Sequence, residues 1–170
     1  MGFFSRLMGG SDEQTTAASE FEILAPVSGE LVHLENTNDP AFSSRSVGDG
    51  VAVVPQEGTV CAPVSGTVAA LFPTEHALGI MSDDSSAQVM LHIGIDTVKL
   101  EGKGFHALVA QGDHVDAGQP LVEVDFDAVR AADFDPTVFV IVCERSENST
   151  LREHASDPVA AKEPVIWLSE

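Results

Sequence analysis

The chain has 170 residues, 44% of them hydrophobic, which is enough to bury one good core and too few for a second full domain. Only 8 Lys and Arg residues stand against 27 Asp and Glu, and the formal net charge of −19 excludes a nucleic-acid binder, whose phosphate contacts need a basic face. Basic proteins are the better-matched partners, although acidity of this strength also serves solubility alone.

Cysteine usage and hydropathy favour a cytoplasmic protein. Cys61 and Cys143 are far apart and form neither a CxxC pair nor a disulfide framework, so we expect two free, buried thiols. No stretch approaches roughly 18 consecutive apolar residues, the length of a membrane-spanning helix. The N-terminus also lacks the apolar core and the cleavage site of a signal peptide.

Residues 1–20 differ from the rest and are interpreted as a flexible arm. Four apolar residues would share one side of a short helix, which Gly9-Gly10 would end: Phe3, Phe4, Leu7 and Met8. Two helical turns are unstable in water, but they could order on a lipid surface where Arg6 meets anionic headgroups. A frayed end is the alternative interpretation of the same residues.

Residues 21–170 have the pattern of one all-β domain, with short runs of Val, Ile and Leu between turn residues. The segment Ala25–Gly29 (APVSG) recurs as Ala62–Gly66, and each precedes an apolar run, as a turn feeding a strand would. A looser pair, 47–55 and 112–124, also places a Gly-Asp turn before an apolar run. These repeats predict duplicated hairpins packed as an antiparallel, barrel-like β-sandwich with very little helix.

Towards the C-terminus, 125–132 is the one segment that predicts a short helix. Residues 138–142 (VFVIV) and 164–168 (PVIWL) are expected to be strands. The polar stretch 144–162 between them is interpreted as a surface loop.

The most informative segment is 88–98 (QVMLHIGIDTV). Successive strand residues point to opposite faces, so Val89, Leu91, Ile93 and Ile95 would form one apolar face towards the core. Met90, His92, Gly94 and Asp96 would then share the outer face. This places an imidazole on a firmly anchored strand, next to a glycine that gives little steric cover, where a large partner can reach it.

Histidine suits phosphoryl relay because neutral imidazole has one nucleophilic nitrogen while the other can donate a hydrogen bond. A single His beside an Asp is more often structural, but a second histidine follows Thr74 in a predicted turn. His76 could donate to a phosphoryl oxygen on His92, with the Thr74 hydroxyl orienting its ring. An incidental loop histidine is the alternative for His76.

The run from His92 to Phe105 (HIGIDTVKLEGKGF), preceded by Thr74-Glu75-His76-Ala77, strongly resembles the glucose-type enzyme IIA family of the phosphoenolpyruvate-dependent sugar phosphotransferase system. The Ala25–Gly29 turn, the Val47–Gly50 turn and Glu163–Ile166 are similar too, so the resemblance covers nearly the whole chain. It implies a phosphotransferase component that carries phosphohistidine and requires no bound cofactor.

The resemblance also implies the roles of individual residues. His92 would receive the phosphoryl group from the phosphorylated HPr carrier and deliver it to a cysteine of the enzyme IIB domain of a IIB/IIC sugar transporter. His76 and Thr74 would assist, and the Gly94 carbonyl would hold the other nitrogen of His92. A partner-binding surface would surround the site, with two acids and four apolar residues: Asp39, Asp96, Phe42, Val47, Phe72 and Met90.

Further partners follow from the same resemblance. Regulated permeases or kinases could bind, and in some family members the two matching histidines share zinc with a partner's carboxylate, which His76 and His92 would permit. The arm over residues 1–20 is similar to a membrane-touching segment, so we expect a cytoplasmic monomer that is transiently at the inner face of the membrane. Ser46, Met90 and Ala41 depart from the family's bulkier apolar residues, which affects affinity for individual partners.

Two other classes share parts of this pattern. Residues 112–121 resemble the turn of biotin and lipoyl carriers, but Lys99, Lys103 and Lys162 do not sit at the exposed hairpin tip that such carriers modify. A zinc peptidase on a related β scaffold would use His76 and His92, yet it needs a third protein ligand. Gly94 stands where a His-x-His pair would have its second histidine, and Asp84 is a weak third candidate.

Overall fold

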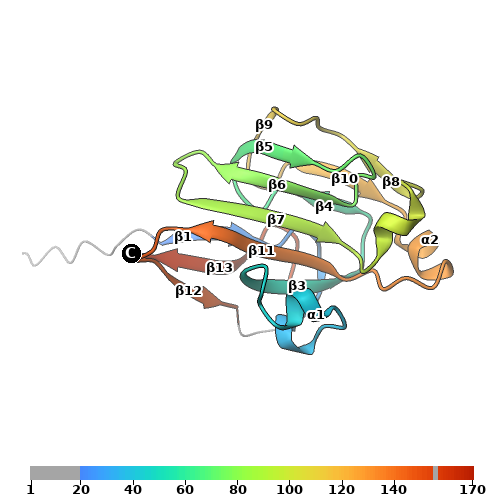
Figure 1. Ribbon diagram of the computed structural model, residues 1–170, viewed down its shortest axis with the longest axis horizontal. Coiled ribbons are helices and arrows are strands. Elements are labelled where there is room, and N and C mark those ends of the chain that lie inside the picture. The colour runs from blue at the N-terminus through green and yellow to red at the C-terminus, as the bar shows by residue number, and fades with distance from the viewer. Residues whose placement is uncertain (1–19, 155–156) are drawn as a thin grey trace, which may run out of the picture.

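The computed structural model describes residues 20–154 and 157–170. Within them the chain is almost entirely strand and turn (Figure 1). The strands are β1 (Phe21–Leu24), β2 (Gly29–His33), β3 (Asp49–Pro55), β4 (Thr59–Cys61), β5 (Gly66–Leu71), β6 (Ala77–Ser82), β7 (Ala87–Ile93), β8 (Phe105–Ala107), β9 (His114–Val115), β10 (Pro120–Val124), β11 (Val138–Arg145), β12 (Thr150–Glu153) and β13 (Pro164–Ser169). The helical pieces are η1 (Leu34–Asn36), α1 (Pro40–Ser43), η2 (Thr97–Leu100) and α2 (Phe126–Ala131).

Three antiparallel sheets form the sandwich. The large sheet has the strand order β2-β3-β11-β7-β6-β5-β9, and the two small sheets are β1-β13-β12 and β4-β10-β8. In Figure 1 β4 and β10 lie behind strands of the large sheet, and β13 and β12 lie below β11. Apolar residues of all three sheets meet in one continuous core. The prediction of an all-β, antiparallel sandwich is therefore confirmed.

Alternation along β7 shows how the sequence places the core. Val89, Leu91 and Ile93 are fully buried against the small sheets, and the residues between them are half-buried on the other face. The buried Val residues of β11 line the same core. Each strand of this kind contributes about 1.5–3 kcal/mol of hydrophobic stabilisation per fully buried aliphatic side chain.

The outer face of the large sheet is also apolar at its centre. A second, smaller core lies there under η1 and α1, made of Leu34, Phe42, Ala52, Phe139 and Ile141. The segment that covers this second core is short, because α1 has only four residues. The Asp39 side chain caps α1 by accepting a hydrogen bond from the Ala41 amide. A helix of one turn has no stability of its own, so its position depends on these tertiary contacts.

The repeated turns have a common steric reason. β2 begins at Gly29 and β5 at Gly66, as the repeats predict. A Cβ atom would lie 1.9 Å from the Val54 carbonyl oxygen at Gly29 and 2.0 Å from the Met81 carbonyl oxygen at Gly66. Each glycine therefore lets the first residue of a strand approach its neighbouring backbone closely.

Three expectations need correction. The predicted helix at 125–132 is present as α2, but α1 and two 3-10 turns accompany it. The stretch 144–162 is not wholly loop, because β11 extends to Arg145 and β12 pairs with β13. The residues of β12 are mostly polar and lie in a narrow outer sheet, so their sequence pattern does not distinguish them from a loop. Of the two free thiols only Cys61 is buried, while Cys143 is half-buried. The arm predicted for residues 1–20 lies almost wholly outside the described residues.

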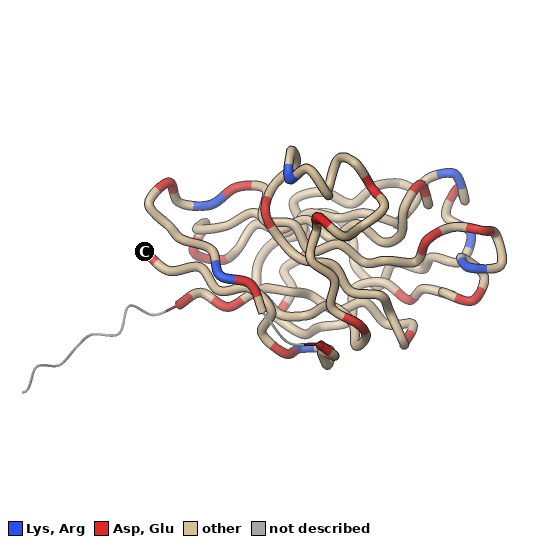
Figure 2. The backbone as a smooth tube through the Cα atoms, turned by 90° about the horizontal axis from the view of Figure 1, so that it is seen from below, with Lys and Arg blue, Asp and Glu red and all other residues tan. Residues whose placement is uncertain are grey.

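In the part of the chain that the structure describes, the charged residues are spread over the molecule and do not form a single patch (Figure 2). In Figure 2 the Asp and Glu residues are spread along the chain on every side of the view, with few Lys and Arg among them. None of the helices in residues 20–154 and 157–170 is long and apolar enough to span a membrane.

We predict that Gly66→Ala lowers the free energy of unfolding by about 2 kcal/mol or more, because the new methyl group must displace strand backbone. Chemical denaturation measures the change. Gly79→Ala is the matched control in the same hairpin, since its Cβ would approach no atom closer than 3.8 Å. Equal stability of the Gly66→Ala protein and the wild type would contradict the steric explanation.

Candidate active site

Strands β6 and β7 bring the two predicted histidines together. His92 lies near the end of β7 and pairs with Ala77 at the start of β6, and the His76 carbonyl accepts a hydrogen bond of 2.7 Å from the Ile93 amide. The ring centroids of His76 and His92 are 5.1 Å apart, with the ring planes at 84°. Two imidazoles therefore meet edge to face at one end of the outer sheet surface.

The tautomer of His92 follows from its hydrogen bond. Its Nδ1 atom lies 2.8 Å from the Gly94 carbonyl oxygen. A carbonyl oxygen can only accept, so Nδ1 carries the hydrogen and donates. In the neutral ring Nε2 then has no hydrogen and keeps its lone pair, which is the form a nucleophile requires.

Gly94 is placed by a tight turn that only glycine fits. Its φ is +79°, and a Cβ atom would lie 2.3 Å from the Thr97 Cγ2 atom. The amides of Gly94 and Ile95 donate to the carbonyls of Thr137 and Asp135, at 2.8 and 2.9 Å. The carbonyl that holds His92 is thus fixed on both sides.

Because of this turn, the predicted strand alternation does not continue to Ile95 and Asp96. β7 ends at Ile93, and both Gly94 and Asp96 have positive φ, so the alternation of faces stops there. Ile95 does not join the main core but packs against the second core. Asp96 is exposed near His92 because of the turn and not because of strand alternation.

His76 is oriented by Thr74, as its sequence neighbours suggest. The Thr74 Oγ1 atom lies 2.6 Å from Nδ1 of His76, and the histidine is only 4% exposed. A threonine hydroxyl can donate to Nδ1, which then leaves Nε2 of the neutral ring as a donor. Such an N–H is suited to an anionic oxygen bound beside His92.

Aromatic rings pack around the two histidines. Phe42 from α1 lies 5.2 Å from the His92 ring and is stacked on Phe139 at 4.4 Å between centroids. Phe139 is the β11 residue paired with His92, and Phe72 lies 5.6 Å from His76. These rings limit the positions that each imidazole can adopt.

Burial and charge act on His92 in opposite directions. Burial lowers the pKa of His92 below its ordinary value of 6.5, while the Gly94 carbonyl and the charges of Asp39 and Asp96 raise it. Burial also lowers the pKa of His76, and the neighbouring His92 lowers it further. Both rings are therefore neutral at neutral pH, and both acids predicted from the sequence lie close enough to affect His92.

The expected partner-binding residues differ in exposure. Phe72 is 48% exposed and Val47 is 38% exposed, and Met90 is half-buried. Phe42 is only 6% exposed, so its ring mainly supports His92 from the side. Val98, 49% exposed and two residues after Asp96, is an apolar surface residue that the sequence reasoning missed.

Two supporting residues were also missed. Phe139 was assigned to a strand, but only the register between β11 and β7 places it beside His92. Asp135 lies in a loop, where its carboxylate accepts from the Thr137 amide and from the Asn38 side chain, next to Asp39. No local sequence signal distinguishes Asp135 from other surface acids.

The two histidines supply only part of the ligand set that zinc requires. Both Nδ1 atoms have hydrogen-bond partners, so the chain could offer zinc the Nε2 atoms of His76 and His92. Across residues 20–154 and 157–170 no three His, Cys, Asp or Glu side chains are grouped to hold a metal ion, and Asp84 instead caps a turn through Ser86. Two ligands fit a shared site and not a complete one.

A family model described as the phosphoenolpyruvate-dependent sugar phosphotransferase system, EIIA 1, matches residues 21–148. The chain belongs to this family. This EIIA chain is 41% identical over 144 residues to the PTS system glucose-specific EIICBA component of Streptococcus pneumoniae, covering 85% of the chain and 20% of that protein. It is 38% identical over 170 residues to the PTS system beta-glucoside-specific EIIBCA component of Bacillus subtilis, covering 99% and 28%.

Its fold matches the glucose permease IIA from Mycoplasma capricolum with a TM-score of 0.80 and 33% identity, covering 88% of this chain and 96% of that one. The chain is thus an EIIA phosphocarrier of the glucose type, as the sequence resemblance implies. It spans 20–28% of the length of the two transporter components named above.

We predict that His92 and His76 both titrate below pH 6.5, because burial opposes protonation of each ring. Nitrogen-15 NMR of the histidine side chains measures this, and at pH 7 it should show hydrogen on Nδ1 of His92 and none on its Nε2. His114 is the internal control, since its exposed ring beside Asp83 has a raised pKa and should titrate above 6.5. A His92 signal with hydrogen on Nε2 would contradict the assigned tautomer.

Proposed function

We propose that His92 is the phosphorylated residue of this EIIA chain and that it accepts the group on Nε2 from the phosphorylated HPr carrier. The observation that carries the proposal is the hydrogen bond from Nδ1 to the Gly94 carbonyl, which leaves Nε2 unprotonated. Half-burial of His92 keeps the ring fixed while one edge can reach a partner.

The transfer balances without a free proton. The Nε2 lone pair of His92 attacks phosphorus, the phosphorus–nitrogen bond of the donor breaks, and its electron pair returns to the donor's ring. The phosphorylated ring of His92 keeps hydrogen on Nδ1 and carries positive charge, which strengthens its bond to the Gly94 carbonyl. A cysteine thiolate of enzyme IIB then attacks phosphorus, and the bond to Nε2 breaks.

His76 and Thr74 assist in this proposal. With the Thr74 hydroxyl donating to Nδ1, the Nε2–H of His76 donates to a phosphoryl oxygen between the two rings. The lowered pKa of His76 keeps it a neutral donor, so it binds the phosphoryl group without holding it as tightly as a cation would. A carrier needs this balance because it must release the group again.

The partner surface combines apolar contact with acidic guidance. Phe72 and Val47 expose apolar area, the half-buried Met90 adds to it, and Phe42 supports His92 from the side. Asp39 and Asp96 flank His92 and would pair with basic groups of the carrier or the transporter. A small apolar patch rimmed by acids suits the transient docking of several partners.

The transporter context comes from the relatives. The names of the two curated relatives specify glucose and beta-glucoside, so we infer a IIB/IIC sugar transporter of this group as the acceptor. We further infer action as a cytoplasmic monomer at the inner face of the membrane, with regulated permeases or kinases as additional partners. A phosphoryl group at the centre of the docking surface would change affinity for such partners.

No bound cofactor enters the proposed reaction. Zinc would bind only where a partner adds ligands to Nε2 of His76 and of His92, and phosphorylation of His92 would remove one of these ligands. A zinc peptidase needs a third protein ligand, and none is grouped with these histidines in the described residues.

We predict that phosphoenolpyruvate, enzyme I and HPr add one acid-labile phosphoryl group to the wild type and none to His92→Ala. His76→Ala should still accept the group but pass it on about 10²- to 10³-fold more slowly, since it lacks a donor to the transferring oxygens. Intact mass and single-turnover transfer measure the two effects. Acceptance should fall as the pH drops below the lowered pKa of His92, because protonated Nε2 has no lone pair.

His114→Ala is the matched control, because this exposed histidine lies at β9 in contact with Asp83 and should leave both steps unchanged. Phosphorylation of His92→Ala at the wild-type rate would overturn the assignment of the phosphorylated residue.

A further inference from the structure

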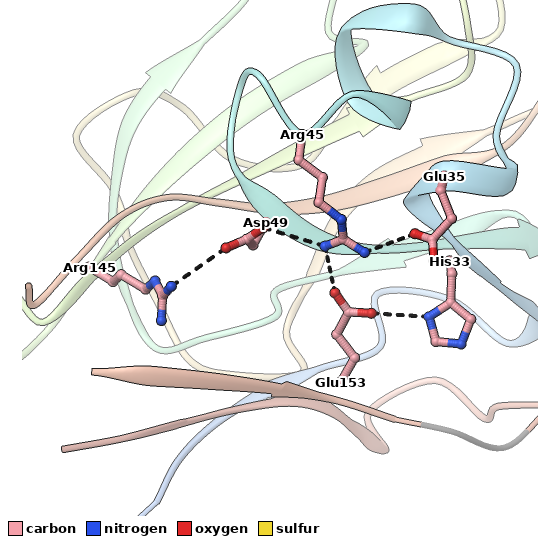
Figure 3. A network of polar contacts seen from close by, with 6 residues as sticks. All are labelled: His33, Glu35, Arg45, Asp49, Arg145 and Glu153. Atoms are coloured by element: carbon pink, nitrogen blue, oxygen red, sulfur yellow. Dashed lines mark hydrogen bonds and ion pairs between the residues drawn. The ribbon is translucent and has the colours of Figure 1, made fainter. Parts of the chain in front are cut away.

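A network of polar contacts, the Arg45 network, joins the cover of the site to the C-terminal hairpin. Figure 3 shows its six members, which are His33, Glu35, Arg45, Asp49, Arg145 and Glu153. The Arg45 guanidinium contacts Glu153 at 2.7 Å, Glu35 at 2.9 Å and Asp49 at 3.4 Å. Glu153 also contacts Nδ1 of His33 at 3.0 Å, and Arg145 contacts Asp49 at 3.5 Å.

The central pair is not an ordinary surface ion pair. The Glu153 side chain is 17% exposed and the Arg45 side chain 32%, so water screens their contact less than that of an open pair. Two of the three carboxylates around Arg45 accept hydrogen bonds that raise the pKa of its guanidinium. The bond to Glu153 has the larger effect, and the bond to Glu35 the smaller. In a chain with 8 basic and 27 acidic residues, two of the eight, Arg45 and Arg145, lie in this network.

Arg45 is tied directly to the helix that covers His92. It follows α1, and its amide donates to the Phe42 carbonyl at 3.0 Å. Its φ of +59° is a conformation that a non-glycine residue adopts only when its surroundings require it. The guanidinium contacts therefore fix the exit of α1, and α1 carries Phe42 and Asp39 beside His92.

The partner of Arg45 comes from far along the chain. Glu153 is the last residue of β12, 108 positions away, and it lies beyond the residues 21–148 that the family model matches. β12 forms the edge of a small sheet that contributes no residue to the site itself. The ion pair is thus a link between this outer hairpin and the cover of the site.

We propose that Arg45 and Glu153 are positioning residues that hold α1, with Phe42 and Asp39, against the His92 ring. The proposal rests on the proposed function only for its kinetic consequence, because the position of α1 can be measured in the unphosphorylated protein. Without the pair, α1 loses its fixed exit, and the Phe42 ring is free to shift against His92 while it remains in the second core.

The test uses the full chain with Glu153→Gln, Arg45→Lys and the control Arg152→Gln. Arg152 precedes Glu153 on β12 but pairs with Glu20 and stacks on Trp167, so its variant disturbs the hairpin and not the Arg45 network. Arg45→Lys keeps the charge, but one ammonium cannot replace the two arms that reach Glu153 and Glu35, and an intermediate effect is expected.

Two readouts need no phosphoryl transfer. Hydrogen exchange at the amides of Ser43, Ser44 and Arg45, which close α1, should be faster by about fivefold in Glu153→Gln. The ring resonances of His92 should shift as the Phe42 ring moves, in the order Glu153→Gln, then Arg45→Lys, with Arg152→Gln like the wild type. The proposal would be overturned if hydrogen exchange in α1 and the His92 resonances were unchanged in Glu153→Gln and Arg45→Lys. It would also be overturned if Arg152→Gln changed them equally.

The kinetic readout separates positioning from chemistry. The KM for phosphorylated HPr should rise about threefold in Glu153→Gln, because α1 contributes to docking, while the maximal rate stays within about twofold because the bond from His92 to Gly94 is intact. A fall in the maximal rate with unchanged KM would count against a positioning role. If α1 and the His92 resonances respond but the wild type accepts no phosphoryl group, the positioning role stands and the proposed function fails.

Discussion

The hydrogen bond from Nδ1 of His92 to the Gly94 carbonyl is the constraint on which the site depends. It selects one tautomer, and it requires a carbonyl in a turn with φ of +79°, which leaves no room for a side chain at position 94. Loop 135–137 then fixes that turn through two backbone hydrogen bonds. A property of one nitrogen atom is thus set by contacts between segments about forty residues apart in the chain.

The large sheet can support this site because both of its faces are apolar near His92. One face closes the main core, and the other carries a small core under a one-turn helix. The imidazole is therefore held by rings on one side and open to a partner on the other. A phosphocarrier needs this combination, since the group must be positioned for chemistry and yet pass between two large proteins.

Much of this was predictable where the information is local. Strand alternation placed Val89, Leu91 and His92 correctly, and the repeated Pro-x-x-Gly turns marked the starts of two strands. The prediction was wrong for Ile95, because a glycine turn ended the strand two residues earlier. The supporting contacts are long-range, as with Phe139 opposite His92 or Glu153 opposite Arg45, and depend on register and sheet packing that local patterns do not contain.

The position of the phosphorus–nitrogen bond tests the central claim most directly. Phosphorus-31 and nitrogen-15 NMR of the phosphorylated, isotope-labelled protein distinguishes the two ring nitrogens of His92. Because Nδ1 donates to the Gly94 carbonyl, we predict phosphorus on Nε2 and a hydrogen that remains on Nδ1. Phosphorus on Nδ1, or on His76, would show that this hydrogen bond does not select the reacting atom.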